Sequence, residues 1–198
     1  MPHITVLDQS TINKIAAGEV IERPSSVVKE LLENAIDAQA TAVTVEIRDG
    51  GISYIRVTDN GCGIPKEEVP LAFLRHSTSK IKSVEDLFTV SSLGFRGEAL
   101  SSIASVAQVE LITKTSEQLS GTRYQIEGGV ERSYEEVGAP DGTTFLVRNL
   151  FYNTPARQKF LKTAQTEGSH VAALVEKIAM SHPDISIRFI QNNQNRLH

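Results

Sequence analysis

Two polar residues, Glu30 and Asn34, stand four positions apart on one side of a predicted helix. Pro24 and the two serines after it are a typical helix start, and apolar residues then recur with helical spacing over 24–38. Glu30 and Asn34 share the polar arc, one turn apart, so both can address one small object. A carboxylate and an amide so placed can activate water and hold a hard cation. Periodicity alone favours the solvated side of an amphipathic helix instead.

A glycine-rich loop follows a predicted β-hairpin. Alternating residues predict a hairpin over 42–58 with a turn at 49–51, and residues 59–63 then read Asp-Asn-Gly-Cys-Gly. Glycines let backbone approach a flat ligand, and an ionised Asp59 can accept a hydrogen bond from an exocyclic amine. An Asx-type turn between two elements is an equally good interpretation of the same residues.

Two further loops carry residue types that suit phosphate. Residues 94–97, Gly-Phe-Arg-Gly, lead into a predicted helix at 98–107, whose first N–H groups could cradle an anion. The Gly-Lys-Ser/Thr ending of a P-loop is absent from this stretch. Residues 77–80, Ser-Thr-Ser-Lys, offer hydroxyls and a cation, although such stretches are common in surface loops. Arg157 and Lys159 favour a solvated helix edge over a nucleic-acid contact.

The remaining elements predict an α+β fold. The first 15 residues indicate an arm or a short strand and helix, and 16–21 are ambiguous. Helices are predicted at 66–75, 83–88 and 166–180, with another starting at 155. Strands are predicted at 109–115, 122–127, 130–137, 143–150 and 185–190. This order predicts helices on one face of a mostly antiparallel sheet.

Composition places the chain among ordinary globular proteins. The 198 residues are 40% hydrophobic and 22% charged, and the net charge of −4 gives no support to a dedicated DNA-binding domain. The single cysteine excludes an intrachain disulfide framework, and we expect Cys62 to be inert. The five histidines lack ligand spacing, so we expect no zinc site. Neither a spanning apolar run nor a secretory signal is present, so we expect a cytoplasmic protein without membrane contact.

Four motifs, taken together and in order, resemble the signature of the GHKL ATPases. They are Glu30-x-x-x-Asn34, Asp59-x-Gly61-x-Gly63, Gly94-x-x-Gly97 and Gly142-Thr143-Thr144. This superfamily includes type II topoisomerases, a heat-shock chaperone, sensor histidine kinases and the MutL mismatch-repair proteins. Three longer stretches, at 12–24, 94–100 and 150–157, are similar to the MutL proteins specifically. The resemblance covers essentially the whole chain.

The resemblance implies a GHKL (Bergerat) two-layer sandwich with a mobile ATP lid at about 77–97. It implies that Glu30 is the general base, that Asn34 helps to hold Mg²⁺, and that Asp59 accepts from the adenine amino group. Gly63 would permit close approach, and Thr143 would assist through its hydroxyl or through water. The remaining expected nucleotide contacts are Thr78, Ser79, Lys80, Gly94, Phe95, Arg96, Gly97, Glu98, Ala99 and Leu100.

The implied activity is a slow, Mg²⁺-dependent ATPase in DNA mismatch repair. ATP would order the lid and pair two N-terminal regions, coupling a MutS-type mismatch-recognition protein and DNA to downstream repair through the longer protein. The family has a second (transducer) domain, which supplies a lysine to the γ-phosphate, and a C-terminal dimerisation domain. We expect residues 1–198 to be the isolated nucleotide-binding domain. Lacking one good electrostatic group, on the order of 3 kcal/mol, it would turn over very slowly alone.

Two alternatives stay open at this point. One is another GHKL ATPase of the gyrase type, and the other is a scaffold that uses ATP only as a conformational ligand. One departure from the family pattern lies at Gln39, where many relatives have glycine. Glycine tolerates the left-handed conformation that often follows a helix, so this substitution bears on the end of the predicted helix.

Overall fold

The computed structural model describes residues 6–75 and 98–198, which form five α-helices, three short 3₁₀ turns and eight strands. The helices are α1 (Gln9–Val20), α2 (Pro24–Asp37), α3 (Ala99–Val106), α4 (Pro155–Phe160) and α5 (Ala164–Ser181). The 3₁₀ turns are η1 (Asp49–Gly51), η2 (Lys66–Glu68) and η3 (Leu71–Phe73). The strands are β1 (Ala42–Arg48), β2 (Tyr54–Asp59), β3 (Gln108–Lys114), β4 (Gly121–Glu127), β5 (Val130–Val137), β6 (Gly142–Arg148), β7 (Ser186–Gln191) and β8 (Gln194–Leu197).

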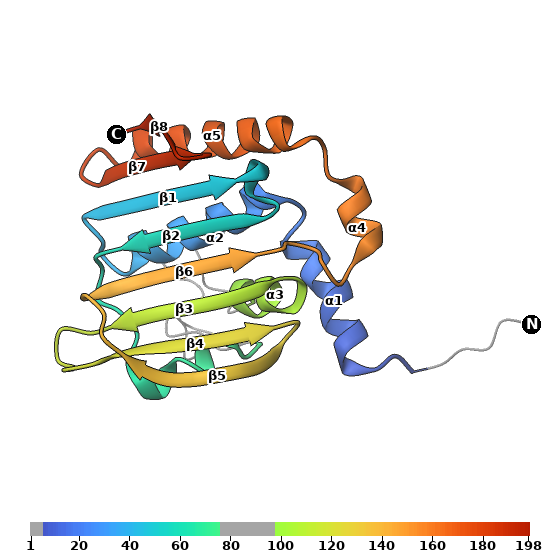
Figure 1. The fold of residues 1–198 in the computed structure, drawn as a ribbon, viewed down its shortest axis with the longest axis horizontal. Helices are drawn as coiled ribbons and strands as arrows, with labels where there is room; N and C mark the ends of the chain where they lie inside the picture. Colours follow the sequence, from blue (N-terminus) through green and yellow to red (C-terminus); the bar gives the residue numbers. More distant parts are fainter. Residues whose placement is uncertain (1–5, 76–97) are drawn as a thin grey trace, which may run out of the picture.

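One twisted sheet holds all eight described strands, in the order β5-β4-β3-β6-β2-β1-β7-β8. Figure 1 shows α2 and α3 behind this sheet, with α5 beside β7 and β8 at one end of it. Among the described strands, β1 and β7 pair in parallel and every other neighbouring pair is antiparallel. The prediction of an α+β fold with a mostly antiparallel sheet is therefore confirmed.

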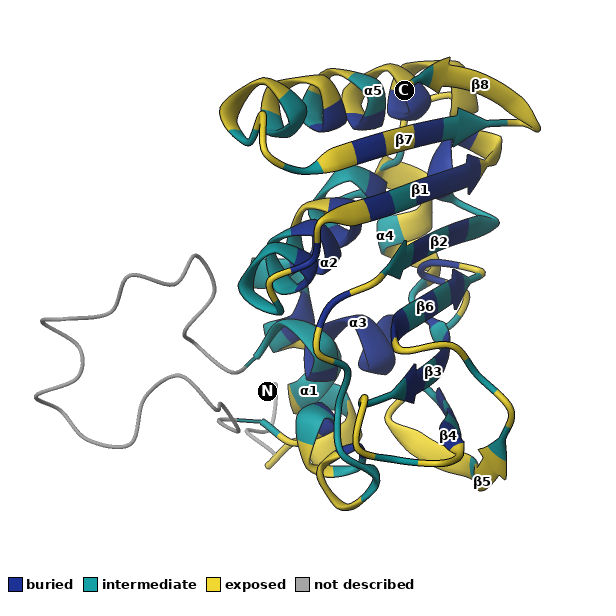
Figure 2. Cartoon of the chain, turned by 90° about the vertical axis from the view of Figure 1, so that its left-hand side faces the viewer, coloured by how far each residue is buried: buried dark blue, intermediate teal, exposed yellow. Residues whose placement is uncertain are grey.

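The core lies between the sheet and the helices. The apolar stripe of α2 is buried as its periodicity predicted, and its buried members are Val27, Val28, Leu31, Leu32 and Ala35. These side chains meet the inward residues of the central strands, among them Val45, Ile55 and Val57. Figure 2 shows the buried residues concentrated on the faces that α2, α3 and the sheet turn toward one another. Burial of this stripe fixes which side of α2 stays polar, and therefore where Glu30 and Asn34 lie.

Three elements differ from the predictions. The helix expected at 66–75 is wrong, because two short 3₁₀ turns lie there; Pro70 lacks an N–H group and disfavours helix in the residue before it. Helix α1, Gln9–Val20, covers part of the segment 1–15, for which an arm or a short strand and helix was predicted, and most of the ambiguous residues 16–21. Strand β8 was not predicted, although Asn192 and Asn193, both at positive φ, form the kind of turn that closes a hairpin. The short helix expected at 83–88 lies outside the described residues.

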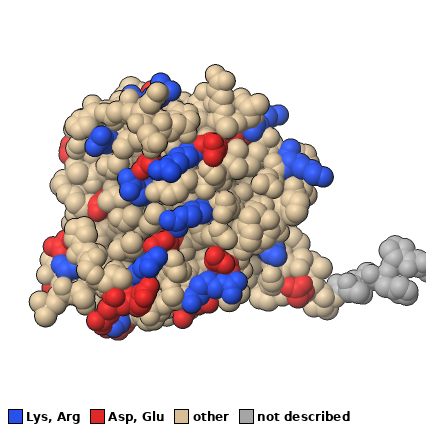
Figure 3. Space-filling model, viewed as in Figure 1, with Lys and Arg blue, Asp and Glu red and all other residues tan. Residues whose placement is uncertain are grey.

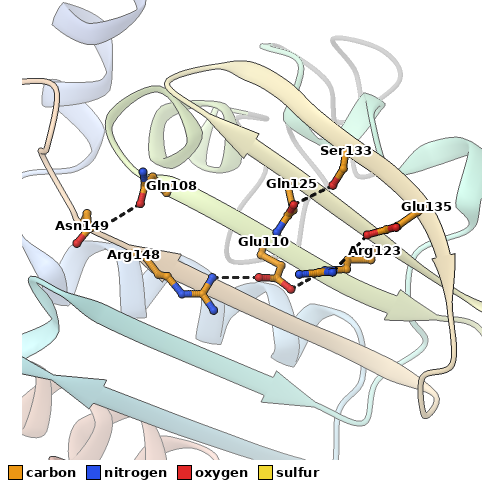
Figure 4. A network of polar contacts seen from close by, with 8 residues as sticks. All are labelled: Gln108, Glu110, Arg123, Gln125, Ser133, Glu135, Arg148 and Asn149. Carbon is orange, nitrogen blue, oxygen red and sulfur yellow. Dashed lines mark hydrogen bonds and ion pairs between the residues drawn. The ribbon is translucent and has the colours of Figure 1, made fainter.

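The opposite face of the sheet carries interleaved charges (Figure 3). Glu110 on β3 accepts from Arg123 Nε at 2.8 Å and from Arg148 Nη1 at 3.0 Å, which joins β4, β3 and β6 (Figure 4). Burial acts to raise the pKa of Glu110, but hydrogen bonds from Arg148 and Arg123 outweigh it and leave that pKa below its ordinary value. These ion pairs stabilise a sheet face that the described helices leave uncovered.

Candidate active site

Helix α2 presents Glu30 and Asn34 on its polar arc, and both are half-buried. Lys29 Nζ lies 3.9 Å from Glu30 Oε1 and 2.9 Å from Glu33 Oε1, so its charge is shared between two carboxylates. The Glu30 side chain is 22% exposed, which leaves it within reach of water. A partly desolvated carboxylate with water access can act as a general base.

The loop at 59–63 begins with an Asx turn, because Gly61 N donates to Asp59 Oδ1 at 2.8 Å. Asn60 ties this loop to the start of β1, since its Oδ1 accepts from Thr41 N and Ala42 N, both at 2.9 Å. The Asx-type turn is therefore present. It occupies only part of the Asp59 carboxylate, so it is compatible with a hydrogen bond to Asp59 from a ligand amine as well.

The same loop is fastened to the end of α2. Cys62 N donates to Ala38 O at 3.0 Å. A side chain on Gly61 would lie 2.7 Å from that same carbonyl oxygen, so the loop and the helix end touch through backbone. This contact fastens the loop that begins at Asp59 to the C-terminal end of the helix that carries Glu30 and Asn34.

Strands β3 and β6 complete the loop surroundings. Asp59 is paired in register with Thr143, and Thr143 Oγ1 lies 3.0 Å from Thr113 Oγ1. The buried Thr113 hydroxyl also accepts from Ile64 N at 2.9 Å. Gly63 has φ +72°, and a side chain there would overlap the backbone of Lys114. Only glycine allows this close approach without strain.

Burial raises the pKa of Asp59, against the backbone N–H groups of Gly61 and Thr143, which lower it. The charged carboxylate of Asp59 is therefore less stable than that of an exposed aspartate, as expected for a partly buried group that can accept a hydrogen bond from a ligand. A partly buried carboxylate with a raised pKa is a typical candidate for a functional group.

Helix α3 begins next to the third motif. Glu98, Ala99 and Leu100 are half-buried, and Glu98 O accepts from Ser102 N at 2.9 Å as the helix starts. The structure thus places these three residues at a helix N-terminus, as predicted. The remaining expected contacts, and the expected lid at about 77–97, lie outside the described residues; these contacts are Thr78, Ser79, Lys80, Gly94, Phe95, Arg96 and Gly97.

Three residues gain roles that the sequence did not predict. Thr113 and Asn60 hold the loop. Thr113 belongs to no recognisable motif, and Asn60 lies inside the 59–63 motif at a position to which the sequence assigned no role. Arg157 was interpreted as a solvated helix edge, and that interpretation is wrong. It is half-buried and donates to the carbonyl oxygens of Ile15 and Ile21. Lys159 is exposed.

Neither a cluster of metal ligands nor a membrane-spanning helix is present among the described residues. No group of three His, Cys, Asp or Glu side chains within 6–75 and 98–198 could hold a metal ion. None of the described helices is long and apolar enough to cross a bilayer. The donor set instead suits Mg²⁺, which needs few protein oxygens when it also binds phosphate and water. The Asn34 amide oxygen is such a donor.

Comparison with known proteins adds independent evidence. Residues 21–141 match the family described as histidine kinase-, DNA gyrase B- and HSP90-like ATPases. The whole chain is 71% identical to part of the DNA mismatch repair protein MutL of Agathobacter rectalis and 55% identical to part of that of Desulforamulus reducens, over 198 and 197 residues. It covers 31% and 30% of these proteins, so the chain spans about a third of the length of the curated relatives it matches.

Solved structures agree with the sequence comparison. The structure of the Aquifex aeolicus MutL ATPase domain complexed with ADP superimposes with a TM-score of 0.72 at 35% identity. That match covers 90% of this chain and 63% of the other. The N-terminal domain of a DNA repair protein gives a TM-score of 0.76 at 31% identity, covering 94% and 54% of the two chains.

Proposed function

Because the chain belongs to the family of histidine kinase-, DNA gyrase B- and HSP90-like ATPases and is a MutL-type ATPase domain, we propose that it binds Mg·ATP and hydrolyses it with Glu30 as the general base. The observation that carries this proposal is the joint between α2 and the 59–63 loop. The hydrogen bond from Cys62 N to Ala38 O connects the helix that carries Glu30 to the loop that begins with Asp59, and this supports a shared site for the two residues.

Asp59 accepts from the adenine amino group in this proposal. Its carboxylate keeps acceptor capacity after the bond from Gly61 N, because an ionised carboxylate has about four acceptor sites. Gly63 allows the loop backbone to approach the base, and Thr143 contributes its hydroxyl beside Asp59. Adenine recognition is therefore assigned to the β2 end of the site.

Glu30 takes a proton from the attacking water, one turn of α2 before Asn34. Asn34 would supply an oxygen to Mg²⁺, which when bound would neutralise charge on the phosphates. The start of α3, at 98–100, directs backbone N–H groups toward the phosphates. The contacts predicted at Thr78, Ser79 and Lys80 and within 94–97 belong to the same proposal.

The wider role is proposed by extension from the relatives. In a chain extended to their length, here called the extended chain, ATP binding would control pairing with a second copy, and through it contact with a MutS-type protein and DNA. Residues 1–198 would form one nucleotide-binding domain within it. On its own, this domain is expected to turn over much more slowly than the extended chain, because a transducer-domain cation would be missing.

The test is a comparison of Glu30→Ala with Glu33→Ala in the extended chain. Glu33 lies on the same helix, pairs with the same lysine, and serves as the matched control. We expect Glu30→Ala to bind Mg·ATP normally and to lose roughly 10²- to 10⁴-fold in single-turnover hydrolysis, the range for a general base. Glu33→Ala should hydrolyse within about twofold of wild type. Unchanged hydrolysis in Glu30→Ala would remove the base from this position and favour an ATP-gated scaffold.

A further inference from the structure

Arg157 on α4 reaches across to the C-terminal half of α1, which lies beside it in Figure 1. Its Nη1 donates to Ile21 O and its Nη2 donates to Ile15 O, both at 3.4 Å. These bonds are long, but they place a cation at the negative end of the α1 dipole. The guanidinium occupies the space that a side chain on Gly18 would fill. Arg157 and Gly18 therefore fit each other sterically.

Helix α1 packs against α3, and Val20 near its end is partly buried against the core. Of its twelve described residues, only Ala17 is buried, and Ile15 is 53% exposed. Beyond the helix, Ile21 is fully buried and its N–H donates to Ala17 O at 2.7 Å. The contact with Arg157 adds a second attachment at the C-terminal half of α1, on the α4 side.

The segment that carries Arg157 also holds α3. Phe151 N donates to Val106 O at 2.7 Å, and Asn153 Nδ2 donates to Ser105 O at 2.9 Å. Both acceptors are at the C-terminal end of α3. The N-terminal end of the same helix, at 98–100, is where the phosphate contacts are expected. The segment at 151–157 thus binds the C-terminal ends of two helices. One is α3, and the other is α1, which runs into α2 after three residues.

We propose that Arg157 is a positioning residue for ATP hydrolysis, which locks α1 to α4 and thereby fixes the start of α2, and with it Glu30, relative to α3. This inference rests on the proposed function, in which α2 carries the base and α3 meets the phosphates. Arg157 does not touch the nucleotide in this scheme. It acts through the position of α2, and adenine binding at Asp59 does not depend on it.

The first test is a double-mutant cycle on the thermal midpoint of the 198-residue chain. Alone, Gly18→Ala should lower the midpoint, because the new methyl group displaces the guanidinium. In the Arg157→Ala background the same change should raise the midpoint, because alanine is a better helix former than glycine and the space is open. A change of the same sign in both backgrounds would overturn the proposed fit.

The second test is steady-state ATP hydrolysis by the extended chain. Arg157→Ala should lower kcat by about tenfold and leave KM within about twofold, because misplacing a catalytic group slows the reaction without removing binding contacts. Gly18→Ala should reproduce this effect, the double variant should be no slower, and Arg157→Lys should be intermediate. Lys159→Ala is the matched control, since Lys159 is exposed on the same helix, and it should retain wild-type kcat.

Two results would overturn the positioning role: wild-type kcat in Arg157→Ala, or a raised KM with unchanged kcat. Glu30→Ala, measured alongside, separates this failure from that of the proposed function. If Glu30→Ala abolishes turnover while Arg157→Ala is unaffected, only the positioning role fails. If Glu30→Ala turns over normally, the proposed function fails first.

Discussion

Replacing Asp59 with asparagine separates the two chemical roles that this residue could have. Asparagine has nearly the same shape, and its Oδ1 can still accept from Gly61 N, so the Asx turn is preserved. What is lost is the negative charge and the unconditional acceptor character of the carboxylate. A purely structural Asp59 should therefore tolerate the change, whereas an adenine acceptor should not.

The expected effect on binding follows from one hydrogen bond to a charged group. Such a bond contributes about 1.5–3 kcal/mol, which corresponds to roughly 10- to 150-fold weaker ATP binding. GTP has an acceptor in place of the adenine amine, so its binding should change little. The assay is competitive displacement of a fluorescent ATP analogue by ATP and by GTP, using the extended chain. The ratio of the two affinities should fall by the same factor as the ATP affinity.

The same substitution, Asp59→Asn, should weaken ATP binding but should not lower the thermal stability of the protein. Because burial raises the pKa of Asp59, the folded state binds this proton more tightly than the unfolded state, and the ionised group is a cost at neutral pH. Asp59→Asn removes that cost, so its thermal midpoint at pH 7 should equal or exceed that of wild type. The difference should shrink as pH falls through the raised pKa, since wild-type Asp59 then becomes neutral as well.

Asn60→Ala is the matched control for this prediction. It removes the hydrogen bonds to Thr41 N and Ala42 N, so it should lower the midpoint while leaving the ATP-to-GTP ratio unchanged. The reasoning would be refuted if Asp59→Asn weakened ATP and GTP equally. It would also be refuted if Asp59→Asn destabilised the protein as Asn60→Ala does, because Asp59 would then be a structural residue.

Two further changes test the support of the site. Gln39 has φ +58°, so Gln39→Gly should raise the free energy of unfolding by up to about 1 kcal/mol, while Gln39→Val should lower it, both measured by urea denaturation. Equal stability of the two variants would contradict this backbone argument. Glu110→Gln should cost about 1–2 kcal/mol at pH 7, after allowance for solvent screening. Because the pKa of Glu110 is lowered in the folded state, the stability difference between wild type and Glu110→Gln should disappear as pH falls below the ordinary value of 4.5. A stability difference that persists in strong acid would refute this explanation.

The parts of the fold that could be predicted from the sequence are those fixed by local patterns. Helix α2 carries a complete apolar stripe, and the β1–β2 hairpin has alternating strands around a glycine turn. Residues 16–21, which include the C-terminal part of α1, were ambiguous because Gly18 weakens the helix signal there, and the side chain that fills the space beside Gly18 belongs to the distant Arg157. Strand β7 was predicted, but its parallel pairing with β1 is a tertiary choice that no local pattern carries.

The candidate site divides in the same way. Glu30, Asn34 and Asp59 stand out because their motifs are short and local. Thr113 could not be found, because a threonine within a strand has no distinguishing neighbours until β3 and β6 bring it beside Thr143. Arg157 was misjudged because its acceptors are main-chain carbonyl oxygens, and these carry no signal in the sequence.

The adenine-binding end and the hydrolytic end of the proposed site are held by different elements. Substitutions at one end should therefore have effects that can be told apart from those at the other. The adenine end rests on β2, β3 and β6, through the pairing of Asp59 with Thr143 and the bonds of Thr113. The hydrolytic end rests on the buried stripe of α2 and, in the proposed positioning role, on the contacts of Arg157. Asp59→Asn should therefore change nucleotide preference while leaving kcat at saturating ATP nearly constant, and Arg157→Ala should do the reverse. If either variant changed both properties together, the ends would be coupled through α2, the one described element that touches the loop and carries the base.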